Sequence, residues 1–251
     1  YESGVKEVTL LGQNVNSYND KKAEKDFPKL LEGIAQALPY LRIRYSTSHP
    51  HDMSDELIYA HQNYDNICNF IHLPVQSGSS KILKKMRRDY TADEYMERIA
   101  MIRKHVPGVA LSTDIISGYC TETEEDHQMT LDLMKEVRYD GAFMFKYSER
   151  GNTLAQKKYP DDVPEEVKTR RLQEIIDQQR AIAGEINEAE VGKTHEILVE
   201  GPSKKKEEMW QGRSDTNKMC IFPYDGEKEG DLLKAKVVSA NSATLFVEIE
   251  E

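Results

Sequence analysis

The sequence has few cysteines and no long apolar run. Its three cysteines, Cys68, Cys120 and Cys220, lie far apart, so the chain has no CxxC pair, zinc-binding pattern or disulfide framework. No apolar stretch approaches the ~20 residues that cross a bilayer, and the first residues lack the apolar core of a signal peptide. We therefore expect a reducing, cytoplasmic location, no membrane partner and no metal site within this chain.

The chain is acidic overall. It contains 34 Lys and Arg against 44 Asp and Glu among 251 residues, which gives a net charge of −10. A protein that coats nucleic acid by bulk positive charge is therefore excluded, and any RNA contact has to rest on a local patch. Hydrophobic residues make up 38% of the chain, which supports a packed core and argues against disorder.

Five apolar segments that end in polar residues are predicted to be buried strands. They cover residues 7–11, 41–46, 70–73, 109–116 and 141–147. Helices are predicted over 79–88, from a capping box at Thr91, from Thr123, and from Pro164 to about residue 190. Strands alternating with helices favour an α/β fold with parallel strands, either an incomplete TIM-like barrel or an open wound sheet.

The pattern changes near Val191. Short alternating strands are predicted over 196–200, 209–213, 219–222, 232–238 and 244–249, with Gly, Pro, Asn and Asp between them. This spacing favours a small antiparallel barrel of the OB type, joined to the first part by the long helix. The predicted domains are residues 1–187 and residues 188–251.

Polar residues at the predicted strand ends form the candidate site, because chemistry in α/β folds lies at the carboxyl ends of strands. The principal candidates are Gln13, Thr47, Gln76, Arg88, Asp114, Tyr147 and Arg150. A carboxylate accepts ribose hydroxyl protons and an arginine fork pairs with a ligand carboxylate, so the set suits a zwitterionic ligand with a ribose. Asp114 is the strongest candidate, since a carboxylate ending an apolar strand is costly to bury without a partner.

Taken one at a time, most of these residues are explained better by simple structural roles. Strand-end Gln, Asn, Ser and Thr form caps and turns. His49 is expected to be a loop histidine, and His72, inside an apolar run, a core residue. Cys68 and Cys120 are expected to be small core or loop residues.

A candidate RNA surface lies in the predicted small barrel, where basic residues are near Trp210 and Phe222. Its residues are Lys204, Lys205, Lys206, Arg213 and Lys218. Basic side chains beside aromatic ones suit RNA phosphates and stacked bases. A solvated hairpin loop remains an equal alternative, because Glu207 and Glu208 follow directly.

Several segments, in one order, resemble the radical S-adenosylmethionine methylthiotransferases of the MiaB type. The matching segments are residues 10–18 (LLGQNVNSY), 42–50 (RIRYSTSHP), 73–79 (LPVQSGS), 83–91 (LKKMRRDYT) and 112–119 (STDIISGY). Residues 198–201 and 212–213 are similar to a TRAM domain. The resemblance implies an incomplete (βα)6 barrel followed by an OB-like TRAM barrel.

The same resemblance implies an activity and a substrate. Members of the family add a methylthio group to C2 of adenosine 37 in tRNA, usually one that carries an N6-isopentenyl group. The residues that would contact S-adenosylmethionine are Gln13, Thr47, Gln76, Arg88 and Asp114. Tyr147 and Arg150 would face the substrate base, and the TRAM domain would hold the anticodon stem-loop.

The chain departs from the family at the iron–sulfur clusters. The CxxxCxxC motif that holds one 4Fe–4S cluster is absent, and so is the N-terminal domain that holds a second. We expect a fragment that is inactive alone and whose partners are its missing N-terminal part and tRNA. Loops 118–123 and 150–153 also differ from the usual Gly-Phe-Pro-Gly-Glu-Thr and Arg-Pro-Gly-Thr.

Two other functions remain open at this point. One is a non-catalytic RNA-binding protein in which a barrel remnant supports the OB-like module. The other is an ordinary TIM-barrel enzyme with acid–base residues Asp114, Glu122 and His49. An uncovered sheet edge also predicts a tendency to dimerise or aggregate.

Overall fold

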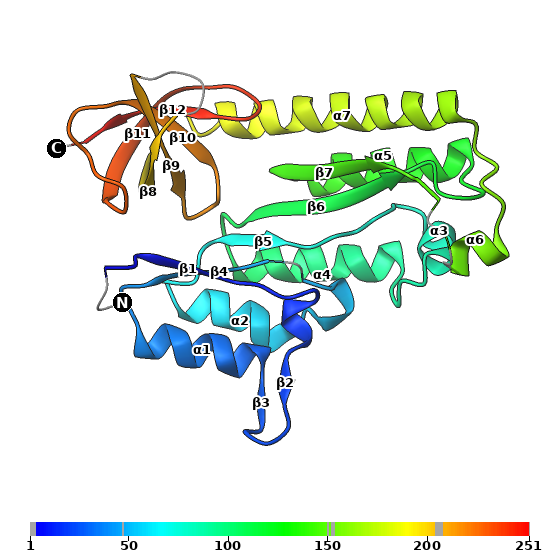
Figure 1. Ribbon diagram of the computed structural model, residues 1–251, viewed down its shortest axis with the longest axis horizontal. Helices are drawn as coiled ribbons and strands as arrows, with labels where there is room; N and C mark the ends of the chain where they lie inside the picture. The colour runs from blue at the N-terminus through cyan, green and yellow to red at the C-terminus, as the bar shows by residue number, and fades with distance from the viewer. Residues whose placement is uncertain (1–3, 47, 150, 152–153, 204–207, 251) are drawn as a thin grey trace.

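The computed structural model describes residues 4–46, 48–149, 151, 154–203 and 208–250 (Figure 1). Five predicted site residues lie outside these ranges: Thr47, Arg150, Lys204, Lys205 and Lys206. Among the described residues, no helix is both long and apolar enough to cross a membrane.

Parallel strands form the first part of the molecule. They are β1 (Glu7–Leu10), β4 (Arg42–Tyr45), β5 (Phe70–His72), β6 (Ala110–Ser117) and β7 (Gly141–Lys146). The strand β1 pairs with β4, a parallel bridge joins Ile43 to Ile67 just before β5, and β5, β6 and β7 pair in that order. The strands therefore follow one another in chain order, and the prediction of a partial parallel barrel is confirmed.

Helices cover the outer face of these strands. They are α1 (Phe27–Ala37), α2 (Asp55–Asn63), α4 (Ala92–His105), α5 (Glu124–Val137) and α7 (Glu165–Glu188). A reciprocal capping box begins α4 at Thr91, as predicted, and α5 begins at the predicted Thr123, where the structure shows a second capping box. Pro164 is the N-cap of α7, one position before the predicted first turn.

The alternation of side chains along β4 separates the two faces of the barrel wall. Ile43 and Tyr45 are fully buried in the core beneath the helices. Arg42 and Arg44 are on the opposite face, where their guanidinium groups contact the Glu7 carboxylate at 3.1 and 2.8 Å. The inner face of the barrel is thus polar, and its charges are paired at this end.

Short elements follow the carboxyl ends of the strands. The 3-10 helix η1 (Val15–Ser17) and the hairpin of β2 (Asn19–Asp20) and β3 (Lys25–Asp26) follow β1, and η2 (Pro50–Asp52) follows β4. Helices α3 (Ser80–Lys85) and α6 (Leu154–Lys158) lie together at the right-hand end of Figure 1. The helix α3 is shorter than predicted because Arg87 adopts a positive φ of 60°, which a helix cannot continue.

A closed five-stranded barrel forms the second part. Its strands are β8 (Thr194–Pro202), β9 (Met209–Ser214), β10 (Met219–Pro223), β11 (Leu232–Ala240) and β12 (Leu245–Ile249), in the order β10-β12-β11-β8-β9. Ile197, Phe222 and Val237 are in its core. Gly212 is required where β9 crosses β8, because a Cβ there would lie 2.6 Å from the carbonyl oxygen of Leu198. The predicted small barrel is confirmed. Its strand pairs are antiparallel except that of β10 with β12, which is parallel.

The small barrel packs against the amino ends of the parallel strands. The Arg44 guanidinium donates to the carbonyls of Ser214 and Asp215, in the turn between β9 and β10. The Lys218 ammonium lies 2.7 Å from Asp140, at the amino end of β7, and 2.9 Å from the side-chain oxygen of Asn187 in α7. Figure 1 shows the small barrel and the α3–α6 region at opposite ends of the molecule, with α7 running between them.

Candidate active site at the carboxyl ends of the strands

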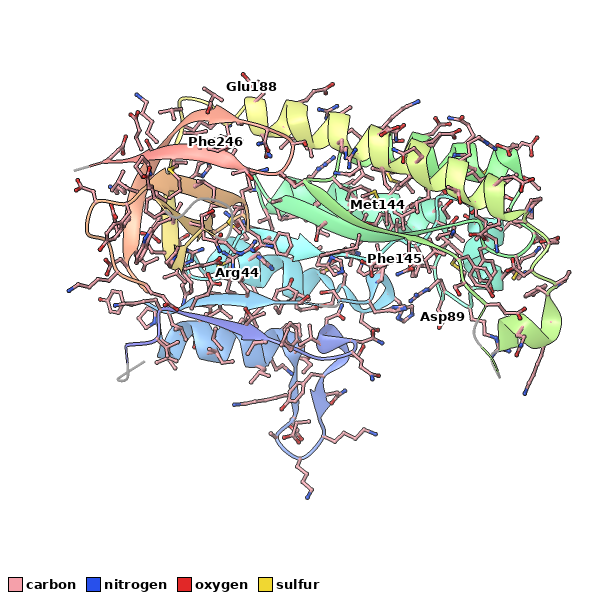
Figure 2. All side chains as sticks on the ribbon, turned by 45° about the horizontal axis from the view of Figure 1, so that its top comes forward. Arg44, Asp89, Met144, Phe145, Glu188 and Phe246 are labelled. Carbon is pink, nitrogen blue, oxygen red and sulfur yellow. The ribbon has the colours of Figure 1, made fainter. Side chains whose placement is uncertain are left out.

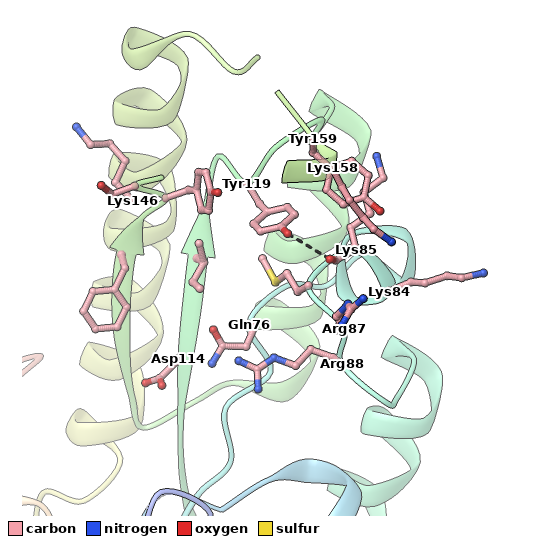
Figure 3. Close-up of a pocket in the computed structure, with 15 residues that line it drawn as sticks. Gln76, Lys84, Lys85, Arg87, Arg88, Asp114, Tyr119, Lys146, Lys158 and Tyr159 are labelled. Atoms are coloured by element: carbon pink, nitrogen blue, oxygen red, sulfur yellow. Dashed lines mark hydrogen bonds between the residues drawn. The ribbon is translucent and has the colours of Figure 1, made fainter. Parts of the chain in front are cut away.

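A cavity of about 770 Å³ opens at the carboxyl ends of β6 and β7. Four of the seven predicted barrel residues line it: Gln76, Arg88, Asp114 and Tyr147. In Figure 3 the side chains of Gln76, Arg88 and Asp114 lie close together on one side of this cavity. An amide, a guanidinium and a carboxylate from three separate segments therefore share one site.

Gln76 is held in an unusual backbone conformation. Its φ is 69°, which is uncommon for a residue with a side chain and often marks a functional site. Its backbone N–H donates to the Asp114 carbonyl at 2.8 Å, and its carbonyl accepts from the N–H of Ile116 at 3.0 Å. These bonds continue the β5–β6 pairing and fix the Gln76 side chain beside Asp114.

Asp114 has a buried histidine as its neighbour. The Asp114 carboxylate lies 3.5 Å from His72 Nε2, and His72 Nδ1 is 2.8 Å from the Ser112 hydroxyl. Burial raises the pKa of Asp114 above its ordinary value, although His72, Arg88 and Gln76 act in the opposite direction. Burial lowers the pKa of His72, while Asp114 opposes that change. His72 is buried as expected, and it also orients the candidate carboxylate.

The loop after β5 is fixed by contacts with α5. Gly78 packs so closely that a Cβ would lie 2.4 Å from the carbonyl oxygen of Met129. Its N–H donates to the Thr130 hydroxyl at 2.9 Å, and the Ser79 hydroxyl donates to Asp126 at 2.7 Å. The glycine in this loop is therefore required by the close approach of a helix, and it supports the position of Gln76.

Aromatic side chains form the far wall of the cavity. The rings of Tyr119 and Tyr147 meet edge to face at 4.9 Å between centroids. The Lys168 ammonium lies 5.4 Å from the Tyr147 ring centre and 2.6 Å from Asp161. The same lysine stem covers Gly118, whose φ is 74°. Lys168 thus anchors α7 against the wall that contains Tyr147.

The remaining barrel candidates have different positions. Gln13 is exposed in the loop after β1 and is not among the described residues that line the cavity. The Asn16 side chain exchanges two hydrogen bonds with the His49 backbone, at 2.9 and 2.8 Å, and so ties the loops after β1 and β4 together. Thr47 and Arg150 lie outside the described residues.

Glu122 and His49, the candidates for ordinary acid–base chemistry, have structural contacts. The Glu122 carboxylate is buried, accepts from the Gly118 N–H at 3.0 Å and pairs with Arg171 at 2.9 Å. The His49 side chain caps η2. Neither residue is among the described residues that line the cavity with Asp114, so the structure does not bring the three together at one site.

The structure changes the interpretation of the predicted RNA surface. Lys218 is only 10% exposed, and its ammonium is committed to Asp140 within the contact between the two parts. These contacts occupy the Lys218 ammonium, and the RNA-binding role of Lys218 and Arg213, which follows from basic residues beside aromatic ones, stays a prediction. Arg213 is partly exposed and pairs with Glu200 at 2.8 Å.

No group of three or more His, Cys, Asp or Glu that could hold a metal occurs among the described residues. Cys68, Cys120 and Cys220 are buried in three different regions, before β5, after β6 and within β10. Because an iron–sulfur cluster needs several thiolates at one place, the cysteines of this chain do not fit one.

The predicted site omitted one group of residues that line the cavity. These residues are basic or aromatic and come from α3, from the turn after it and from the end of α6: Lys84, Lys85, Arg87, Lys158 and Tyr159. The run from Lys84 to Arg88 is conspicuous in the sequence. Its periodicity indicates only a solvated helix face, and nothing local indicates that α6 lies beside it.

Comparison with known proteins places this site in a family. The model of the radical SAM superfamily matches residues 1–134 of the chain, which include Gln76, Arg88 and Asp114. The chain belongs to the radical SAM superfamily. The model of the TRAM domain matches residues 188–249, which contain the small barrel.

Curated relatives of this radical SAM protein are similar over almost its whole length. It is 55% identical over 244 residues to the tRNA-2-methylthio-N(6)-dimethylallyladenosine synthase of Chlorobium phaeobacteroides, covering 97% of this chain and 55% of the relative. It is 54% identical to the synthase of the same name from Phocaeicola vulgatus, covering 97% of this chain and 54% of the relative. The chain thus spans about half the length of these relatives.

A solved radical SAM structure supports the fold. Coproporphyrinogen III oxidase from Escherichia coli superimposes with a TM-score of 0.54 at 15% identity, covering 83% of this chain and 55% of that one. At this identity the similarity shows the fold alone. The expected incomplete radical SAM barrel followed by a small TRAM barrel is therefore confirmed.

Proposed function

We propose that this chain is the rear part of a tRNA methylthiotransferase that adds a methylthio group to C2 of N6-isopentenyladenosine 37. The observation that carries the proposal is the meeting of Gln76, Arg88 and Asp114 at one cavity in a radical SAM barrel. The names of the relatives support the substrate, and the TRAM match supports an RNA partner. The proposed boundary between the radical SAM barrel with its connecting helix and the TRAM barrel lies between residues 187 and 188.

The three cavity residues suit the two ends of S-adenosylmethionine. Asp114 supplies an acceptor for two ribose hydroxyls, while Arg88 supplies a planar, permanently charged donor for the methionine carboxylate. Gln76 can donate to or accept from the ribose side. When bound beside a reduced iron–sulfur cluster, this cofactor supplies the radical that starts such reactions.

The chain's own residues would bind and orient rather than transfer protons. The hydrogen bonds and contact that join His72 to Ser112 and Asp114 fix the carboxylate, and the Gln76 backbone fixes the amide. Tyr147 and Arg150 are proposed to face the substrate base, and the position of Tyr147 on the aromatic wall of the cavity supports its part in this. Gln13 and Thr47 complete the proposed set of residues that contact the cofactor.

The clusters would be held elsewhere in a longer polypeptide. The proposed methylthiotransferase would use two 4Fe–4S clusters, and the cysteines of this chain fit neither. We propose that residues 1–251 alone do not catalyse the reaction. The TRAM barrel is proposed to help bind the anticodon stem-loop, and the proposed location of the protein is the cytoplasm. A CxxxCxxC motif encoded shortly before Tyr1 would support this; a reading frame that begins at Tyr1 would contradict it.

Cofactor cleavage tests the site in the full-length gene product. We expect Arg88→Ala and Asp114→Ala each to abolish or greatly reduce release of 5′-deoxyadenosine under reducing conditions. Loss of a hydrogen bond to a charged group costs about 1.5–3 kcal/mol, or roughly 10- to 150-fold in affinity. Lys104→Ala, an exposed change on α4, is the control. Unchanged cleavage in both site variants would refute the assignment.

A further inference from the structure

The rim of the candidate active site is strongly cationic, although the chain is acidic. The cavity-lining residues include six cations, Lys84, Lys85, Arg87, Arg88, Lys146 and Lys158. Among the described residues that line it, Asp114 is the only acid. Cations that gather without acids repel one another, so such a patch is expected where an anionic partner binds.

These cations differ in whether they form ion pairs within the chain. Lys146 is paired with Glu165, and Arg88 lies beside Gln76 and Asp114 (Figure 3). Lys84, Arg87 and Lys158 are exposed, and none has an ion-pair partner within the described part of the chain. We call these three residues the cationic rim. Its members come from α3, from the turn after α3 and from the end of α6, so the fold brings them together.

The conformation of this region keeps the cations at the opening. Arg87 has a φ of 60°, a left-handed conformation that ends α3. The Tyr119 hydroxyl donates to the Lys85 carbonyl at 3.2 Å, which ties α3 to the loop after β6. Figure 3 shows Lys84, Arg87 and Lys158 on the same side of the cavity, away from Asp114.

An aromatic side chain lies beside the cationic rim. Tyr159 follows Lys158 directly, is half-buried, and has the Lys85 ammonium 5.3 Å from its ring centre. Cations that can meet phosphates beside an exposed aromatic face are the combination that binds single-stranded nucleic acid. An acidic peptide would use the cations but would leave the ring without a stacking partner.

We propose that the cationic rim binds backbone phosphates of a single-stranded RNA loop whose base enters the cavity, with Tyr159 stacking on a neighbouring base. This inference rests on the proposed function and adds a second RNA contact to the TRAM barrel. The two contacts lie at opposite ends of α7, whose 24 residues span about 36 Å. RNA held by the TRAM barrel alone would not be positioned at the cavity.

The test is the salt dependence of binding of a labelled anticodon stem-loop RNA to the whole chain, followed by fluorescence anisotropy. We expect Lys84→Ala/Arg87→Ala/Lys158→Ala to reduce the slope of log affinity against log salt by about 2, since each single-strand phosphate contact contributes about 0.7. At ~0.1 M salt this corresponds to a loss of affinity of up to roughly 100-fold.

A matched control removes the same charge elsewhere. Lys6→Ala/Lys104→Ala/Lys135→Ala changes three exposed lysines at positions away from the rim. We expect a change in slope below about 0.5, because no direct phosphate contact is lost. Equal changes in slope for the two triple variants would refute the proposed role of the cationic rim, since bulk charge would then explain the binding.

The aromatic contact has its own readout. We expect Tyr159→Ala to weaken RNA binding by roughly 5- to 100-fold, and Tyr159→Phe to retain it, because stacking needs the ring and not the hydroxyl. Far-UV circular dichroism checks that the variants fold. An equal loss in the Phe variant would refute stacking.

Two further outcomes separate the inference from the function on which it rests. If the wild-type chain does not bind the stem-loop at low salt, the RNA partner itself is refuted and the rim with it. If a poly-glutamate peptide binds with the same affinity and competes fully, the rim recognises acidic peptide and the RNA assignment is wrong, whereas cofactor cleavage by the full-length protein would be unaffected.

Discussion

Asp126 joins the two loops that shape the candidate active site, and it allows a quantitative prediction. Its carboxylate accepts from the Ser79 hydroxyl at 2.7 Å, from the Lys81 ammonium at 2.6 Å and from the Thr123 N–H at 3.0 Å. Ser79 caps α3 and Thr123 caps α5. Loss of this carboxylate would loosen the loops after both β5 and β6.

The magnitude follows from the pKa of Asp126. Burial alone would raise this pKa, but the hydrogen bonds from Lys81, Ser79 and Thr123 overcome it and lower the pKa from 3.8 to about 2. This difference corresponds to about 2.4 kcal/mol of folding free energy at neutral pH. Because the folded-state pKa is lowered, the contribution is present above pH 4 and disappears as the pH falls through about 2.

The assay is urea unfolding of Asp126→Asn, followed by far-UV circular dichroism of the helices. We expect a loss of about 2 kcal/mol at pH 7 that shrinks to about half at pH 3, where the wild-type carboxylate has lost part of its advantage. Asp132→Asn is the control on the same helix; its side chain is 62% exposed and its pairing with Lys135 is long, at 3.8 Å. We expect its effect to stay below about 0.5 kcal/mol. A loss that is equal at pH 7 and pH 3 would refute the electrostatic argument.

Three further predictions concern neighbouring parts of the site. Gly78→Ala should destabilise the protein by about 1–3 kcal/mol and weaken S-adenosylmethionine binding, because the added Cβ meets the α5 backbone. A wild-type free energy of unfolding together with a wild-type calorimetric affinity would refute this prediction. Arg171→Leu should cost about 3–5 kcal/mol by leaving the buried Glu122 unpaired, and adding Glu122→Leu should recover part of that loss in a double-mutant unfolding cycle. As the pH falls, cofactor binding should weaken at a higher pH than an ordinary aspartate would give, because burial raises the pKa of Asp114 and the acceptor must be ionised. Calorimetric titrations of wild type and Asp114→Asn from neutral to acidic pH would check this. Equal pH profiles of the two proteins would contradict it.

The strands and capped helices of the barrel could be predicted because their signals are local. Thr91 and Thr123 each carry the capping residues within four positions, and each strand is a short apolar run ended by polar residues. The helices α1 and α2 were not predicted, although Asp26 and Ser54 cap them. The signals of α1 are local as well, since Phe27, Leu31 and Ala35 recur at helical spacing, whereas α2 mixes polar residues into its buried face, including His61.

The candidate site was predictable in part for a related reason. Gln76 follows β5 and Asp114 lies in the carboxyl half of β6, and parallel strands bring their carboxyl ends to one edge, so the meeting of these two follows from topology. Arg88 reaches the same edge from the turn after α3. The pairing of His72 with Asp114 depends on the register of β5 against β6, which the sequence does not specify locally. The contact of Lys218 with Asp140 joins residues 78 positions apart, so no local signal in the sequence indicates it.

The fixed placement of the TRAM barrel has a consequence for RNA binding. The hydrogen bonds of Arg44 to the β9–β10 turn and the contacts of Lys218 with Asp140 and Asn187 hold the small barrel against the amino ends of the parallel strands. Two binding surfaces held at a fixed separation bind one ligand as though at high effective concentration, provided the ligand spans both. A substrate arm that reaches along α7 from the TRAM barrel to the cationic rim gains from both contacts, whereas a short single strand reaches only one. If both proposed surfaces bind RNA, the architecture selects an RNA by the length over which it can reach as well as by the base that enters the cavity.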